Sequence, residues 1–435
     1  MKEKFSKLGN ILIEKVMKFA NTKSIIALRD GFMLTMPITL AGSIFMLIGN
    51  FPVPNWQETV SKYLGENWNI GLSQVTGSTF DILAIVAVLG ISYVYLKNED
   101  LDAISGALIS LIAFLIITSS TVSTESGEVI KGVIPKAWVN GNGVIAAIIV
   151  GLIAPKIFAF FIRKKIIFKM PDSVPTGVSN AFAALIPGVV IFFLAMIVYQ
   201  TCMIFGGISF TEVIFKVLQT PLQSLTGSLP GGIIIITLMS LLFWVGVHGP
   251  NVVNGIVSAL LMANATSNQT IIDSGQALIA GENASIITKQ VTENFAKFGG
   301  TGITLGLIIA VLLAGKSKQF KTISKMSLVP GMFNINEPII FGLPIVFNPI
   351  MFIPFILIPL FALLITYFSI LLGFLQPFGN LFIPWATPPI ISGFLLGGWQ
   401  GAVVQLVILL MSIAMYYPFM KLQDNMFLKQ ENSEI

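Results

Sequence analysis

The sequence contains very few residues that carry covalent or metal chemistry. Among its 435 residues there is one cysteine, Cys202, and one histidine, His248. A single cysteine cannot form a disulfide within the chain, and Cys202 has no obvious metal-ligating neighbours. This count also excludes a separate soluble phosphohistidine or phosphocysteine domain. We therefore expect no metal and no cofactor, and any phosphoryl group must come from another polypeptide.

Charged residues are also scarce. They make up 10% of the chain, whereas soluble proteins carry roughly a quarter, and 55% of the residues are hydrophobic. The mean hydropathy is +0.87. This composition predicts an all-α polytopic membrane protein. The formal net charge of +5 comes largely from basic clusters beside the apolar segments, so it reports topology and does not indicate nucleic-acid binding.

The first 20 residues combine lysines with apolar residues at helical spacing, among them Phe5, Leu8 and Leu12. They lack a short apolar core followed by a small-residue cleavage site, so we expect no removable signal peptide. The pattern predicts an amphipathic helix on the cytoplasmic membrane surface.

Hydropathy predicts about ten membrane spans, each near the ~20 residues that cross a bilayer. Basic residues at the N-terminus, at 163–169 and at 316–325 fall on one side, which the positive-inside rule makes cytoplasmic. Both termini are then inside, and 50–79, 119–140, 206–229 and 264–299 are outside. The predicted spans are 31–49, 80–96, 101–118, 142–162, 182–205, 230–247, 250–263, 300–314, 348–372 and 396–417.

A polar connection near the middle of the chain contains a helix start signal. Ser209 and Glu212 form a capping-box pattern ahead of apolar residues, which predicts an interfacial helix over 209–219 within a linker spanning 206–229. The cytoplasmic connection 163–181 contains Pro171 and Pro175. Both connections would permit movement between two halves of the chain.

The segment 331–349, GMFNINEPIIFGLPIVFNP, places the carboxylate Glu337 inside an apolar region of membrane length. An ionisable group at such depth indicates a functional site. Pro338, Pro344 and Pro349 interrupt a continuous helix, so we expect a broken helix or re-entrant hairpin that lines a cavity. A second proline-broken segment, FIPWATPPIISG, contains Trp385.

Side chains suited to a hydroxyl-rich ligand accompany Glu337. His248 lies between glycines in FWVGVHGPN, an indole can stack on a sugar ring, and amides both donate and accept hydrogen bonds. Structural alternatives stay open: His248 bonded to a backbone carbonyl, Glu337 capping helix N–H groups, tryptophans in the interfacial belt, and asparagines as turn residues. The candidates are Glu337, His248, Asn334, Asn336, Asn251, Trp244 and Trp385.

Three segments together resemble a known family: residues 331–349, the FWVGVHGPN run, and IALRDGF at 26–32. The chain is similar to enzyme IIC, the membrane component of bacterial phosphoenolpyruvate-dependent sugar phosphotransferase systems, in the lactose, cellobiose and diacetylchitobiose branch. The resemblance implies a homodimer in the bacterial cell membrane, with ten membrane helices and two re-entrant hairpins per subunit. It divides the chain into a dimerisation half (1–205), a sugar-transport half (230–417) and a cytoplasmic tail (418–435).

The resemblance also implies a mechanism. A β-linked disaccharide, cellobiose or N,N'-diacetylchitobiose, enters from outside and presents its 6-hydroxyl to the phosphocysteine of a separate IIB protein. A IIA protein supplies the phosphoryl group to IIB. Glu337 would be the base with His248 beside it, and Asn140 and Gly141 would contact the distal sugar from the other half. The subunit would not be an enzyme on its own.

Two other functions stay open. One is a proton-coupled sugar symporter in which Glu337 and His248 form a proton relay. The other is a non-transporting membrane sensor or scaffold that uses the same pocket only for recognition.

Overall fold

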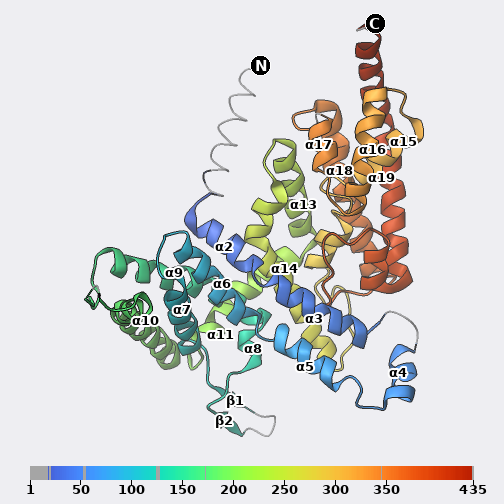
Figure 1. Ribbon diagram of the computed structural model, residues 1–435. Coiled ribbons are helices and arrows are strands. Elements are labelled where there is room, and N and C mark those ends of the chain that lie inside the picture. Colours follow the sequence, from blue (N-terminus) through green and yellow to red (C-terminus); the bar gives the residue numbers. More distant parts are fainter. Residues whose placement is uncertain are drawn as a thin grey trace.

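The computed structural model describes residues 18, 21–51, 55–123, 128–171, 173–343 and 345–433. Nearly all regular structure in this part of the chain is helical (Figure 1). The predicted amphipathic helix over 1–20 lies outside the described residues apart from Lys18, and so does Pro344.

The first part of the chain folds into helices around one antiparallel hairpin, in which Thr121 pairs with Lys131. The hairpin lies at the bottom of Figure 1, opposite the end of the last helix. The elements are α2 (Lys23–Met33), α3 (Met36–Gly49), α4 (Trp56–Leu64), α5 (Ile70–Thr79), α6 (Leu83–Lys97), α7 (Ala103–Ile116), β1 (Thr121–Ser123), β2 (Val129–Lys131), α8 (Lys136–Val139), η1 (Gly141–Gly143), α9 (Val144–Arg163) and α10 (Thr176–Gly206).

The helix predicted to start at Ser209 is present and extends further than expected. The Ser209 hydroxyl accepts from the Glu212 N–H, while the Glu212 carboxylate accepts from the Ser209 N–H at 2.7 Å. Both orphan donors at the helix start are thus satisfied. Three consecutive elements follow this cap: α11 (Phe210–Ile214), the π-helix η2 (Phe215–Gln219) and α12 (Thr220–Gly227). The chain then bends by 76° into α13 (Leu229–Trp244).

The last part of the chain contains long helices separated by irregular, buried backbone. The final helix is kinked where Gly397 and Gly398 leave helical geometry. The elements after α13 are α14 (Gly249–Asp273), the π-helix η3 (Val291–Phe295), α15 (Leu305–Ala314), α16 (Lys318–Met332), α17 (Glu337–Gly342), α18 (Pro349–Leu371) and α19 (Ile391–Ser433).

Every predicted span overlaps a helix, but the helices differ in whether they are long and apolar enough to cross a bilayer. Among the described residues, six helical segments are long and apolar enough, and the bent pair Phe210–Gly227 with Leu229–Trp244 makes a seventh if it is one span. The predicted spans 101–118 and 300–314 correspond to the shorter apolar helices Ala103–Ile116 and Leu305–Ala314.

Much of the stretch 264–299, which is predicted to lie outside, is packed in the interior of the protein. α14 continues to Asp273, and Ile287, Val291 and Phe295 are completely buried. The charged residues of this stretch lower its hydropathy, so hydropathy alone does not reveal its burial.

Buried apolar side chains of the described residues form two separate clusters. The N-terminal core takes its members from α2 to α10, including Ala87, Ile91 and Phe158. The C-terminal core extends from Ile235 in α13 to Phe427 in α19. Four residues from beyond residue 230 nevertheless belong to the N-terminal core: Ala259, Met262, Ala265 and Phe382. The two cores therefore meet along α14 and the segment that contains Phe382.

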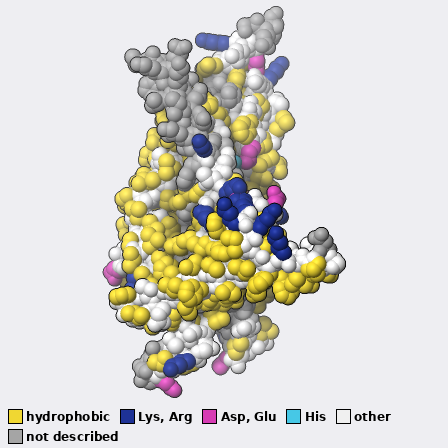
Figure 2. Space-filling model, turned by 90° about the vertical axis from the view of Figure 1, so that its left-hand side faces the viewer, with side chains coloured by type: hydrophobic (Ala, Val, Ile, Leu, Met, Phe, Trp, Pro, Cys, Tyr) yellow, Lys and Arg dark blue, Asp and Glu magenta, His cyan; other side chains and the backbone are white. Residues whose placement is uncertain are grey.

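The surface has a broad apolar band with a cluster of Lys and Arg at its upper margin (Figure 2). On α10, Phe193, Ile204 and Phe205 are 56%, 66% and 86% exposed, as expected for a helix that faces lipid or a partner. At the end of α6, buried Glu99 pairs with Lys23 at 2.7 Å and with Arg163 of α9. This carboxylate therefore joins the ends of three helices.

Candidate functional site

The predicted break in the helix within residues 331–349 is present in the structure. α16 ends at Met332 and α17 begins at Glu337, and Asn334 between them has a positive φ of 65°. The Asn334 amide donates to the carbonyls of Trp385 and Thr387, the latter at 3.0 Å, and its Oδ1 accepts from the Gly299 N–H. Asn334 therefore links its own segment by hydrogen bonds to the segment that contains Gly299 and to the segment that contains Trp385.

Asn336 is likewise bonded to other groups of the protein. Its side chain is buried and donates to the Thr301 carbonyl at 2.8 Å and to Thr304 Oγ1 at 3.0 Å. Gly300 has a φ of +87°, and a Cβ there would overlap the Asn336 amide. The close approach of these two segments therefore requires glycine. Both asparagines shape the site, and their amides already have protein partners.

His248 is held at the start of α14 as its N-cap residue. Its Nδ1 accepts a hydrogen bond from the Asn251 N–H at 3.3 Å, and its ring lies 4.9 Å from that of Phe243. In the neutral imidazole one nitrogen accepts and the other carries the proton. The proton is therefore assigned to Nε2, which faces Glu337.

His248 Nε2 and Glu337 Oε1 are 3.7 Å apart, and both side chains are a little under half exposed. This separation is too long for a direct hydrogen bond. An oxygen placed to one side of the two atoms can accept from Nε2 and donate to the carboxylate at normal hydrogen-bond distances. The pair is thus arranged to hold one hydroxyl group.

These two residues line a cavity of about 850 Å³, within the size range of ligand sites. Trp385, Asn334, Asn336 and Asn251 line it as well, so the structure brings together six of the predicted residues. Trp385 is 45% exposed although it lies in a proline-broken segment.

The cavity also contains charged residues that sequence reasoning missed. Asn254 donates to Glu293 at 3.0 Å, and Arg29 Nε contacts Asp30 at 2.6 Å. Arg29 and Asp30 belong to the IALRDGF run, which carried the family resemblance without being considered for the site. The other charged residues fall in 264–299, the stretch predicted to lie outside. The additional charged residues that line the cavity are Arg29, Asp30, Lys289, Glu293 and Lys297.

Three predicted residues lie elsewhere. The Trp244 indole donates to the Asn348 carbonyl at 3.0 Å and packs on Phe352, with ring centroids 4.7 Å apart. Asn140 Oδ1 accepts from its own loop, and the Gly141 carbonyl accepts from Gln219. None of Trp244, Asn140 and Gly141 lines this cavity. Their contacts instead indicate structural roles at helix junctions.

Comparisons with known proteins agree with this architecture. The family model described as "Phosphotransferase system, EIIC" matches residues 29–359. The lichenan permease IIC component of Bacillus subtilis (strain 168) is 36% identical, with 98% of this chain and 96% of that protein covered. The cellobiose-specific EIIC component of Geobacillus stearothermophilus is 34% identical, with coverage of 96% and 93%.

A solved structure is similar over almost the whole length. The transporter ChbC, the IIC component from the N,N'-diacetylchitobiose-specific phosphotransferase system, superposes with a TM-score of 0.92 at 34% identity. The alignment covers 98% of this chain and 99% of that one. The chain therefore belongs to the EIIC family of the phosphotransferase system, the membrane-embedded sugar permease components.

Proposed function

We propose that this permease takes up a β-linked disaccharide, cellobiose or N,N'-diacetylchitobiose, from outside and presents its 6-hydroxyl to a phosphorylated IIB protein in the cytoplasm. The observation that carries the proposal is the His248–Glu337 pair, 3.7 Å apart in a cavity of about 850 Å³. The printed specificities of two similar proteins, cellobiose and N,N'-diacetylchitobiose, support the choice of sugar.

The chemistry at the pair follows from its geometry. The sugar hydroxyl lies between Nε2 of His248 and the Glu337 carboxylate. As the hydroxyl oxygen attacks the phosphorus carried by IIB, its proton passes to Glu337, and the phosphoryl group leaves the IIB cysteine for the sugar. His248 holds the hydroxyl oxygen in place. Trp385 stacks on the sugar ring, and Asn251, which lines the same cavity, contributes a further hydrogen bond.

The cationic side chains of the cavity fit the product. Arg29, Lys289 and Lys297 line the same space as the pair. Phosphorylation makes the sugar anionic, and lysine and arginine stabilise phosphate oxygens through charge-assisted hydrogen bonds. The phosphorylated sugar cannot leave through the membrane, so the cytosolic phosphoryl donor drives accumulation.

The same proposal includes an architecture. Residues 1–205 form a dimerisation half and 230–417 a transport half, joined by the linker 206–229 and followed by a cytoplasmic tail. The separate N-terminal and C-terminal cores support this division. Each subunit has ten membrane helices and two re-entrant hairpins, which lie around Glu337 and Trp385. Two subunits form a homodimer through their N-terminal halves, and both termini are cytoplasmic. The exposed apolar side chains of α10 suit a dimer contact or lipid.

The test uses the purified protein in sealed vesicles with labelled cellobiose and diacetylchitobiose, with and without phosphorylated IIB, and with the proton gradient clamped. We expect sugar to cross without a gradient and to accumulate as its phosphate only when phosphorylated IIB is present. Accumulation that needs only the proton gradient would establish the symporter in its place. Binding without any transport would establish the sensor.

A further inference from the structure

We propose that a second cavity, between α3, α5 and α14, is an outer subsite where a neutral, hydroxyl-rich sugar binds before it reaches the His248–Glu337 cavity. The inference rests on the proposed function of the chain as a disaccharide permease. The outer cavity has a volume of about 370 Å³, at the lower end of the range for ligand sites.

The outer cavity lies toward the membrane face opposite the basic residues. Asp81, just before α6, lines it, whereas the far end of α6 is near Glu99, which pairs with Lys23 and Arg163. α6 has 15 residues, so it separates these two ends by about 22 Å. In the proposed orientation, with the basic residues inside, the cavity opens toward the outside.

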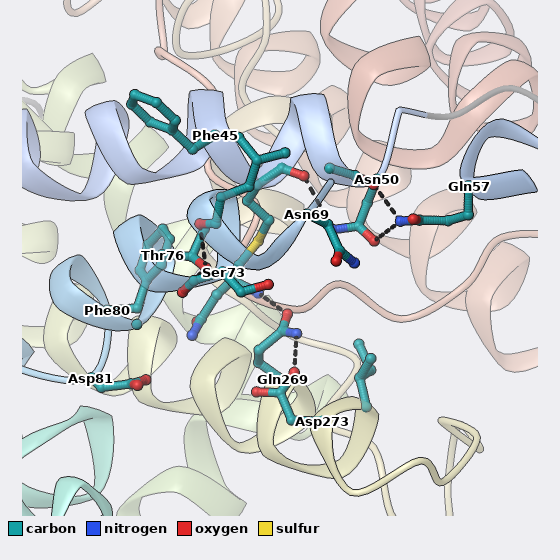
Figure 3. Close-up of a pocket in the computed structure, with 16 residues that line it drawn as sticks. Phe45, Asn50, Gln57, Asn69, Ser73, Thr76, Phe80, Asp81, Gln269 and Asp273 are labelled. Carbon is teal, nitrogen blue, oxygen red and sulfur yellow. Dashed lines mark hydrogen bonds between the residues drawn. The ribbon is translucent and has the colours of Figure 1, made fainter. Parts of the chain in front are cut away.

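The lining is polar and contains hydrogen-bonding groups that remain available. Figure 3 shows Asn69 and Ser73 on one wall of the cavity, with Gln269 on another. Within the described part of the chain, neither the Asn69 amide nor the Ser73 hydroxyl has a hydrogen-bond partner, although both line the cavity. Amide and hydroxyl groups donate and accept, so they match sugar hydroxyls.

The charge of the lining selects against anionic ligands. Asp81 and Asp273 line the outer cavity, and none of its lining residues, all of them described, is Lys or Arg. Lys136 contacts Asp81 at 3.0 Å, and Gln269 donates to Asp273 at 2.9 Å, so both carboxylates are partnered. The inner cavity, by contrast, holds Arg29, Lys289 and Lys297 together with the acidic residues Asp30, Glu293 and Glu337. A neutral sugar suits the outer cavity, whereas a sugar phosphate does not.

Three segments lead from one cavity to the other. On α3, Met36 lines the inner cavity and Met46 the outer one, about 15 Å further along the helix. On α14, Ser258 lines the inner cavity and Gln269 the outer one, about 16 Å further along the helix. The broken segment contributes Asn380 outside and Trp385 inside, at most about 18 Å apart. These three segments therefore line the route that a sugar would take between the two cavities.

The two cavities are separate in the present structure. Phe382 lies between Asn380 and Trp385 and is only 7% exposed. Its ring is 6.0 Å from that of Phe80, which itself lines the outer cavity, and its N–H donates to Ser43 of α3. This contact between the broken segment and the N-terminal half would have to open for a sugar to pass along the segment.

The test is protection of an engineered thiol. Ser73→Cys in a Cys202→Ser background is labelled on intact cells with a membrane-impermeant maleimide, with and without external cellobiose. The same measurement is made after adding His248→Ala and Glu337→Ala to disable the inner site. At a cellobiose concentration ten times the half-protecting value, we expect labelling to slow roughly tenfold in both backgrounds, because only the free subsite reacts. Asn69→Cys provides a second position should Ser73→Cys fail to fold.

Ser78→Cys is the matched control, since Ser78 is exposed on the same helix and does not line the cavity. It should be labelled at the same rate with or without sugar. Three results would overturn the subsite: no protection in the Ser73→Cys variant, protection lost with the inner-site substitutions, or labelling only from the cytoplasmic face. Failure of the proposed transport function would instead appear in the vesicle assay, which does not depend on labelling at residue 73.

Discussion

The N–H of Phe382 donates a hydrogen bond to Ser43 Oγ at 2.9 Å, although 339 residues separate the two in sequence. The Ser43 hydroxyl in turn donates to the Thr39 carbonyl at 2.7 Å within α3. Both residues are buried, so this contact anchors the second proline-broken segment to the N-terminal half.

Replacing Ser43 with alanine should loosen that anchor. The Phe382 N–H would then lack an acceptor in a buried position, which costs about 1–3 kcal/mol. We expect a lower Tm in detergent and faster hydrogen exchange at Phe382. Ser110→Ala is the control, because the buried Ser110 hydroxyl donates only to Gly106 on its own helix. Unchanged exchange at Phe382 in the Ser43 variant would mean that the anchor does not form in solution.

Glu337→Gln should separate sugar binding from phosphorylation. Glutamine keeps the size of the side chain but cannot accept the hydroxyl proton, and a general base contributes about 10²–10⁴-fold. We expect the phosphorylation rate with saturating IIB to fall by about 100-fold or more, while cellobiose binding is largely retained. Glu282→Gln, at an exposed position outside the cavity, should change neither quantity. An equal loss of both in Glu337→Gln would make Glu337 a binding residue only.

Trp385→Ala tests stacking on the sugar. Loss of the indole should cost about 1–2 kcal/mol, or roughly 5–30-fold in Kd for cellobiose measured by calorimetry. Trp399→Ala removes a tryptophan that is 60% exposed and packs on Phe374 away from the cavity. That variant should bind the sugar normally. If the two variants behave alike, Trp385 belongs to the interfacial belt and not to the sugar site.

Trp244→Phe should affect stability and leave sugar affinity unchanged. The indole N–H donates to the Asn348 carbonyl, and this bond is worth about 0.5–1.5 kcal/mol. Phenylalanine keeps the aromatic packing on Phe352 but loses the donor. Thermal unfolding should therefore begin at a lower temperature, with the Kd for cellobiose unaltered. A higher Kd for cellobiose with an unchanged Tm would instead indicate that Trp244 contacts the sugar.

The predictable parts of the structure have local signals. Membrane-length apolar runs located the helices, the Ser209–Glu212 pattern located the linker cap, and the prolines around Glu337 located the break. Each depends on residues close together in sequence, where hydropathy, capping and proline geometry act directly.

The parts that could not be predicted depend on distant partners. Asn334 and Asn336 were expected to offer their amides to a ligand, yet those amides bond to backbone groups of other segments. Nothing in the local sequence distinguishes the two uses. Glu293 and its neighbouring lysines were placed in an outside stretch and not in the site, because a sequence does not reveal which distant charges line the same cavity.

The N-terminal core cannot be completed during synthesis until Phe382 has been made. The N-terminal core takes its last N-terminal member, Ala195, from α10, but it also includes Ala259, Met262, Ala265 and Phe382. At about 5–20 residues per second, the ribosome needs about 10–40 s to proceed from Ala195 to Phe382. Throughout that interval the inserted first half lacks Phe382 from its core, so an N-terminal half expressed alone would have an incomplete core.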